Sequence, residues 1–398
     1  MPQIALYDPA EHEPLADRAW DAAVARTFVE RTVREVDAAY DRAAPWPVHP
    51  EDRDDETDAL PLHGVYFGSA GTMWALTALA RRYGLELGSD YATGIARVER
   101  HYRRHPLETE TVVPSYFVGA TGIMLARYAI TGERAILERI VADTVANRNN
   151  PTCEALWGAS GTAIALLLLR ECAGDSAYDD ELRAVQNALW QTWDQRTNLW
   201  LQDLYGRKLH LVGAGHGAFG NLVPFVRAPD LLSSEQRALL AERIFALLET
   251  YAIRDGAAAN WFERTEPREG NRMQWCHGAP GAIMSLAAYP AHDSRIEALL
   301  VAGGEGIWRA GPLRKGPALC HGTAGNGFAL LRLAQRTGDE RWRDRARSFA
   351  MHAILQVEAW RARFGMPANS LWTGEMGVAV FVDAVLRDDP EVLTLDVI

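Results

Sequence analysis

The sequence is poor in three features, each of which would define a class of protein. Only four cysteines occur in 398 residues, too few for a framework of disulfides. Basic residues are outnumbered, since 41 Lys and Arg stand against 52 Asp and Glu and the net charge is −11. No basic face is therefore available in excess for nucleic acid. The longest apolar run, between residues 154 and 170, is too short to span a bilayer.

Two further signals are missing. The first twenty residues, MPQIALYDPAEHEPLADRAW, have no basic stretch followed by an apolar one, so we find no secretory signal. Alternation of apolar and polar residues is rare, and strands are expected only as local hairpins, one of them near residues 200–212. We therefore expect a soluble, cytoplasmic, all-α protein with no membrane insertion and no nucleic-acid partner.

The sequence does have a repeated Gly-x-x-Gly step that opens an apolar run. The step occurs seven times, and successive first glycines are 39 to 61 residues apart. The seven pairs are Gly68/Gly71, Gly119/Gly122, Gly158/Gly161, Gly217/Gly220, Gly278/Gly281, Gly322/Gly325 and Gly374/Gly377. A repeat that extends over nearly the whole chain indicates one large closed unit.

Each repeat is typical of a pair of helices. The helix after the glycines is apolar almost all round, as in 71–84 and 161–172, which predicts burial on most sides. The helix before them is amphipathic, as in 90–105 and 340–360. The pattern predicts an α/α toroid of seven inner and seven outer helices over residues 61–398. Residues 1–60 are expected to form an N-terminal helical extension packed on it. The inner helices should begin at one end of the toroid, where their first N–H groups would be exposed.

Alignment of the repeats on the first glycine reveals the candidate chemistry. Cys276 and Cys320 lie two positions before it, and His216, His277 and His321 lie one position before it. Equivalent positions of a closed repeat face the same axis, so these side chains should converge. Cys276, Cys320 and His321 form the soft donor set that zinc selects. Three protein ligands leave one position open, as in catalytic zinc sites, although buried cysteines and a core histidine are the alternative.

The neighbouring candidates are open to more than one interpretation. His216 is a general acid/base, a residue that supports a ligand, or a fourth ligand. His277 orients substrate or donates a proton, unless it is a structural histidine. Glu154 is a carboxylate that pairs with a histidine, or a first-turn residue favoured by the helix dipole. Lys315 and Arg363, on loops that lead into these motifs, are candidates to bind a substrate carboxylate.

The motifs QWCHGAPG, LCHGTAGNG and GAGHGAFG together resemble those of the lanthionine synthetase C-like (LanC-like) family, over nearly all of the chain from residue 60. His277 and the Lys-Gly before Leu-Cys-His-Gly resemble the animal-type branch. The resemblance implies the α/α toroid and a zinc ion held by Cys276, Cys320 and His321. It also implies His216 as acid/base, Glu154 at a position that is aspartate in some cyclases, and Lys315 and Arg363 as substrate-binding residues.

The implied reaction is the addition of a thiol to dehydroalanine or dehydrobutyrine, which forms a thioether. The thiol is a cysteine of the same peptide in bacterial cyclases and glutathione in the animal-type branch. A separate dehydratase or kinase has to prepare the dehydrated peptide or protein. Two alternatives remain: a zinc-bearing peptide-binding protein without catalysis, and an α/α-barrel carbohydrate enzyme, which would need paired acidic residues.

Overall fold

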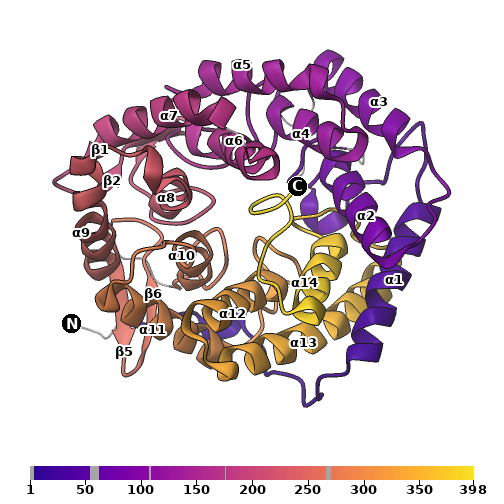
Figure 1. Cartoon of the computed structure of the whole chain (residues 1–398). Helices are drawn as coiled ribbons and strands as arrows, with labels where there is room; N and C mark the ends of the chain where they lie inside the picture. The colour runs from indigo at the N-terminus through magenta and orange to yellow at the C-terminus, as the bar shows by residue number, and fades with distance from the viewer. Residues whose placement is uncertain (1–3, 54–61, 107–108, 175, 266–269) are drawn as a thin grey trace.

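The computed structural model describes residues 4–53, 62–106, 109–174, 176–265 and 270–398. Fourteen α-helices within these ranges form two concentric rings that alternate along the chain (Figure 1). The inner helices are α2 (Ser69–Tyr83), α4 (Ala120–Thr131), α6 (Ala159–Ala173), α8 (Ala218–Arg227), α10 (Ala279–Leu286), α12 (Thr323–Thr337) and α14 (Glu375–Arg387). The outer helices are α1 (Ala22–Ala38), α3 (Tyr91–Arg104), α5 (Leu137–Asn147), α7 (Asp179–Thr192), α9 (Ser234–Tyr251), α11 (Ser294–Ala310) and α13 (Glu340–Phe364).

The predicted α/α toroid is confirmed, and the ring is closed by the two ends of the chain. The last inner helix, α14, packs against α2, and α1 packs against α13, α14 and α2. The seventh outer helix therefore comes from the first sixty residues (Figure 1). The division of the chain into 1–60 and 61–398 stays a prediction, because that boundary lies outside the described residues.

Short elements connect the helices. Three antiparallel hairpins pair β1 (Trp193–Asp194) with β2 (Leu199–Trp200), β3 (Gln202–Leu204) with β4 (Arg207–Leu209), and β5 (Ala252–Asp255) with β6 (Ala258–Trp261). The 3₁₀ helices are η1 (Pro9–Glu11), η2 (Pro50–Asp52), η3 (Arg134–Ile136), η4 (Ser176–Tyr178) and η5 (Pro229–Leu231). Strands are local, as expected near residues 200–212, whereas the hairpin of β5 and β6 was not predicted.

The two rings begin their helices in different ways. Asp21, Asp90 and Asp339 cap the outer helices α1, α3 and α13 through their side chains, as is usual for an exposed helix start. The inner helices begin after a glycine that has no side chain to cap with. At α2, α8 and α12 the first three N–H groups instead donate to carbonyls of the preceding loop, as in Ser69 to Leu62. The prediction of exposed N–H groups at these helix starts was wrong, because the loops curl back over them.

The second glycine of each step is required by close packing of this loop. A Cβ at Gly122 would lie 1.8 Å from the carbonyl oxygen of Tyr116, six residues earlier. The same distance is 1.9 Å at Gly325 and 2.1 Å at Gly281. Real Cβ atoms never approach a carbonyl so closely, so only glycine lets the loop lie against its own helix.

The seven loops are joined to one another by hydrogen bonds that run around the ring. The N–H of Tyr66 donates to Phe117 O (2.9 Å), that of Trp372 to Tyr66 O, and that of Cys320 to Trp372 O. In the same way the N–H of Cys276 donates to Cys320 O, that of Gly215 to Cys276 O, and that of Ala155 to Gly215 O. The Ser115 hydroxyl donates to Leu156 O at 2.5 Å and completes the circle. The residue two positions before the first glycine takes part in all seven links, so equivalent positions of neighbouring repeats are adjacent in space.

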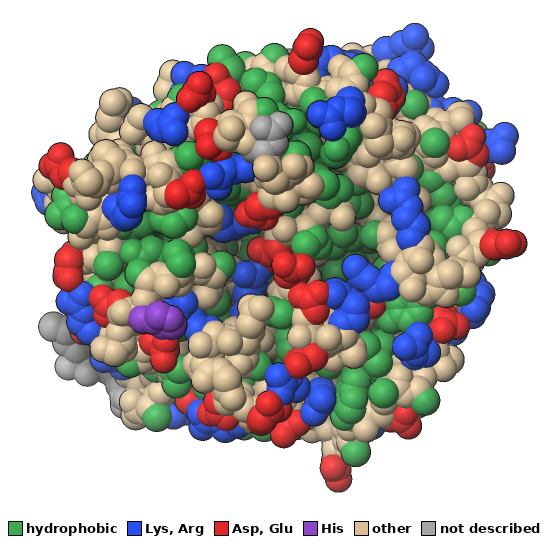
Figure 2. All heavy atoms as spheres, viewed as in Figure 1, with side chains coloured by type: hydrophobic (Ala, Val, Ile, Leu, Met, Phe, Trp, Pro, Cys, Tyr) green, Lys and Arg blue, Asp and Glu red, His purple; other side chains and the backbone are tan. Residues whose placement is uncertain are grey.

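The chain after α14 crosses the middle of the ring (Figure 1). Arg227 donates to the carbonyl of Leu395, and Arg332 forms an ion pair with Asp396. This face is hollowed at its centre and carries acidic and basic side chains there (Figure 2). A cavity of about 400 Å³ is lined by Arg227, Arg332 and Asp396, whereas the cavity deeper in the ring measures only about 30 Å³. The described side chains thus leave little free space inside the ring at this smaller cavity.

Across the described part of the chain, no helix has both the length and the apolar character needed to cross a membrane.

Replacement of a close-packed glycine tests the role of the loops. We expect Gly122→Ala to lower the free energy of unfolding by about 2–3 kcal/mol, because the added Cβ must push Tyr116 O away. Gly88→Ala is the matched control, since its Cβ would meet only an Asp37 oxygen at 3.5 Å. Chemical denaturation measures both variants, and equal stabilities for the two would contradict this role.

Candidate active site

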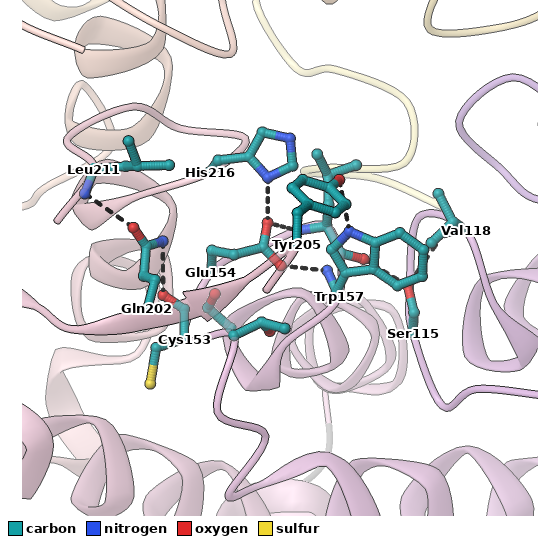
Figure 3. A network of polar contacts seen from close by, with 12 residues as sticks. Ser115, Val118, Cys153, Glu154, Trp157, Gln202, Tyr205, Leu211 and His216 are labelled. Atoms are coloured by element: carbon teal, nitrogen blue, oxygen red, sulfur yellow. Dashed lines mark hydrogen bonds and ion pairs between the residues drawn. The ribbon is translucent and has the colours of Figure 1, made fainter. Parts of the chain in front are cut away.

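Glu154 and His216 form a hydrogen-bonded pair at the end of the toroid where the inner helices begin. Glu154 lies in the loop before α6 and His216 in the loop before α8. The His216 Nδ1 and Glu154 Oε2 atoms are 2.8 Å apart (Figure 3). The Glu154 side chain is fully buried, whereas that of His216 is 21% exposed. The structure thus brings these two predicted residues together, with the histidine on the accessible side.

The Glu154 carboxylate is fixed by the backbone around it. Its two oxygens accept hydrogen bonds from the N–H groups of Leu156 (2.9 Å) and Trp157 (2.5 Å). The preceding carbonyl, that of Cys153, accepts from Asn221 Nδ2 (2.7 Å) and Gln202 Nε2 (3.2 Å). A carboxylate held from several sides orients the imidazole ring that it binds.

This pairing decides the protonation of His216. Burial alone lowers the pKa of the imidazole, but the hydrogen bond and the charge of Glu154 raise it, and the net shift is upward. The negative charge of Cys276 adds to the increase. The direction of this shift favours the protonated imidazole, the form that a general acid must supply.

Cys276 and Cys320 form a second buried pair. Their backbones are linked by the hydrogen bond from Cys276 N to Cys320 O (3.4 Å), and their thiols interact directly. Gln274 Nε2 donates to Cys276 Sγ at 2.9 Å, and the Tyr66 hydroxyl interacts with Cys320. The hydrogen bond with Cys320 lowers the pKa of Cys276, whereas burial raises that of Cys320 well above its usual value. One sulfur of the pair therefore ionises more readily than the other.

The donor atoms of this pair suit a soft metal ion. Burial, together with the charges of Lys315 and Arg272, lowers the pKa of His321 to about 3, so this imidazole is neutral and can act as a ligand. The two thiols already lie in contact, and His321 follows Cys320 in the chain. Across the described ranges, however, no three His, Cys, Asp or Glu side chains stand together as a group that could hold a metal ion. The zinc site therefore stays a prediction.

His277 follows Cys276 in the chain and lies near His216. Its ring centroid is 6.2 Å from that of His216, and its side chain is buried. Gly278, the next residue, has φ +104, and a Cβ there would lie 2.3 Å from Arg272 O. The loop can therefore make this turn only with glycine, which fixes His277 beside the acid/base pair. That His277 orients substrate or donates a proton stays a prediction.

The two predicted cations lie in different surroundings. Lys315 is exposed and acts electrostatically on Cys320 and His321. Arg363 lies in the last turn of α13, with its side chain 70% exposed and its nearest carboxylate, Glu51, 4.0 Å away. The structure thus places Lys315 within electrostatic range of Cys320 and His321, and it shows no contact between Arg363 and the cysteine pair. Both substrate-binding roles stay predictions.

The sequence interpretation missed Tyr66 and Asp52. Tyr66 is partly buried, and burial together with the charges of Cys320 and Cys276 raises the pKa of its hydroxyl well above the usual value. It stands two positions before Gly68, where the cysteines of later repeats stand. That shared position was an available signal. Asp52 accepts a hydrogen bond from Thr373 Oγ1 (2.7 Å), and burial raises its pKa to about 6. It lies near Lys315 because η2 folds onto the ring, which no local pattern reveals.

Comparison with known proteins gives consistent results. The sequence model of the family described as "Lanthionine synthetase C-like protein" matches residues 57–395. The chain is 32% identical over 158 residues to "Glutathione S-transferase LANCL1" of Danio rerio, and 38% identical over 84 residues to "LanC-like protein GCL1" of Arabidopsis thaliana. Among solved structures, "Nisin cyclase" is similar in fold with a TM-score of 0.56 and 15% identity, over 90% of this chain and 99% of that one.

The two curated relatives are matched only in part. The aligned regions cover 38% of this chain and 36% of the Danio protein, and 20% of this chain and 19% of the Arabidopsis protein. The likeness to nisin cyclase concerns the fold, because 15% identity is too low to carry an activity.

The Glu154–His216 pair makes a prediction about titration. In Glu154→Gln we expect the pKa of His216 to fall, because the carboxylate that raises it is gone while burial, which lowers it, remains. The raised pKa in the folded protein also means that the pair stabilises the fold at low pH, and this stabilisation is lost as the pH rises through that pKa. A histidine-resolved NMR titration measures the shift, and an unchanged pKa would show that Glu154 does not control His216.

Proposed function

Because this chain belongs to the lanthionine synthetase C-like family, we propose that it adds a thiol to a dehydroalanine or dehydrobutyrine side chain and so forms a thioether. The observation that carries the proposal is the meeting of two pairs of side chains, one partly and one fully buried. A carboxylate–histidine pair and a pair of thiols come from the loops before α6, α8, α10 and α12, and act electrostatically on each other.

The proposal includes a zinc ion held by Cys276, Cys320 and His321. Two sulfurs and a neutral imidazole fit zinc by their chemistry, and three protein ligands leave a position for a substrate thiol. Bound there, zinc would lower the pKa of that thiol, so that it reacts as a thiolate at neutral pH.

His216 would supply the proton that the addition requires. Attack of the thiolate on the β-carbon leaves negative charge at the α-carbon and its carbonyl, and a proton must then reach the α-carbon. The raised pKa of His216 keeps that proton available, and Glu154 holds the ring through Nδ1. The other nitrogen, Nε2, is left to face the substrate. His277, beside it, would help to orient the acceptor.

The substrate is proposed to be a dehydrated peptide or protein. The thiol would be a cysteine of that peptide or a small thiol such as glutathione, as the name of the Danio relative suggests. Lys315 and Arg363 would bind a substrate carboxylate. The dehydro-residue has to be made by a separate dehydratase, or by a kinase followed by elimination of phosphate. None of the four cysteines, all of which lie in the described ranges, forms a disulfide.

Loss of one ligand tests the metal. We expect about one zinc ion per chain in the wild-type protein and little or none in Cys320→Ala, because two ligands hold zinc far more weakly than three. Cys172→Ala, at an exposed position, is the control and should keep its zinc. Elemental analysis of the purified proteins gives the answer, and full zinc in Cys320→Ala would rule out the proposed ligand set.

Replacement of His216 tests the proton transfer. We expect His216→Asn to retain zinc and to slow thioether formation by roughly 10²–10⁴-fold, the usual contribution of a general acid/base. His292→Asn, an exposed histidine outside the site, should react like the wild type. Mass spectrometry of a dehydrated peptide with added glutathione measures the rate. Loss of zinc from His216→Asn would make this residue a ligand, and full activity would remove it from the reaction.

A further inference from the structure

Tyr205 occupies a place in the backbone that does not suit a tyrosine. It forms, with Gly206, the two-residue turn between β3 and β4, where Leu204 pairs with Arg207. Both turn residues have positive φ, 51° at Tyr205 and 69° at Gly206. Such turns favour Asn, Asp or Gly at both positions, and a bulky side chain with positive φ is uncommon. Strained residues of this kind tend to occur at functional sites.

The Tyr205 side chain lies against the proposed acid/base pair. The indole N–H of Trp157 donates to the Tyr205 hydroxyl at 3.1 Å. The backbone N–H of the same Trp157 donates to the Glu154 carboxylate. The Tyr205 ring meets the His216 ring edge-on, with centroids 6.1 Å apart. The contacts thus form a closed circuit from Glu154 through Trp157 and Tyr205 to His216 (Figure 3).

Tyr205 is nevertheless largely exposed to solvent. Its exposed fraction is 69%, the highest of the large exposed hydrophobic residues in the described part of the chain. The strain in this turn is therefore not explained by burial of the Tyr205 side chain in the core. The turn leaves most of an aromatic side chain exposed to water, directly beside His216.

We propose that Tyr205 is the residue on which the dehydrated segment of the substrate binds, an inference that rests on the proposed function. A dehydroamino acid within a peptide is flat, because its double bond is conjugated with the neighbouring amide. A flat, apolar group of this kind packs well on the face of an aromatic ring. A segment bound on Tyr205 lies next to His216, whose Nδ1 is already bonded to Glu154 and whose Nε2 remains for the α-carbon.

Binding without turnover tests this role independently of the reaction. A fluorescently labelled peptide that contains dehydroalanine is titrated, without thiol, into the wild type, Tyr205→Ala, Tyr205→Phe and Leu201→Ala. We expect Tyr205→Ala to raise the Kd about tenfold, as loss of an aromatic anchor does. Tyr205→Phe keeps the ring and should stay within about twofold of the wild type. Leu201→Ala removes another exposed apolar side chain just before β3 and should have no effect.

The same variants under turnover should show the effect in KM more than in kcat, with Tyr205→Phe close to the wild type. Equal Kd values for the wild type and Tyr205→Ala would overturn the inference, and so would a wild type that does not bind the peptide. A Tyr205→Phe variant as weak as Tyr205→Ala would also overturn it, because the hydroxyl and not the ring would then matter. A wild type that binds the peptide through Tyr205 but forms no thioether would contradict the proposed function alone.

Discussion

The circle of hydrogen bonds between the seven loops is the constraint on which the rest of the structure depends. Each loop donates a backbone N–H, or in one case the Ser115 hydroxyl, to the carbonyl of the next loop. Each loop also lies close against its own inner helix, where the second glycine leaves room for the carbonyl. The helices supply most of the buried apolar surface, but the loops decide how neighbouring repeats are aligned.

That alignment places the chemistry. Cys276 and Cys320 come from different repeats, yet their backbones are bonded to each other because they hold the same place in the circle. Gly215 is bonded to Cys276 in the same way, which sets His216 next to the thiols, and Ala155 is bonded to Gly215, which sets Glu154 next to His216. Four consecutive loops thus bring His216 and its carboxylate partner beside two thiols, although the residues are spread over more than 160 positions of the sequence.

Much of this was accessible from the sequence, since the Gly-x-x-Gly steps predicted the two rings and the shared position of Cys276 and Cys320 predicted their convergence. The pairing of Glu154 with His216 was one of two open interpretations, and only the three-dimensional structure decides between them. Asp52 and Tyr205 were missed because they reach the site through η2 and through a hairpin turn, and both lie outside the repeat. The N–H groups at the inner helix starts were wrongly predicted to be exposed. Their partners are backbone carbonyls of the preceding loops, and because every residue carries such a carbonyl, the sequence does not reveal the contact.

The central claim is that the two cysteines hold a metal ion that receives a substrate thiol. X-ray absorption spectroscopy of the zinc-loaded protein, recorded before and after addition of glutathione, tests it most directly, because the method counts sulfur ligands. We predict two sulfurs from Cys276 and Cys320 in the protein alone and a third when the thiol is present. A sulfur count that does not change on addition of the thiol, or zinc bound without sulfur, would contradict the account.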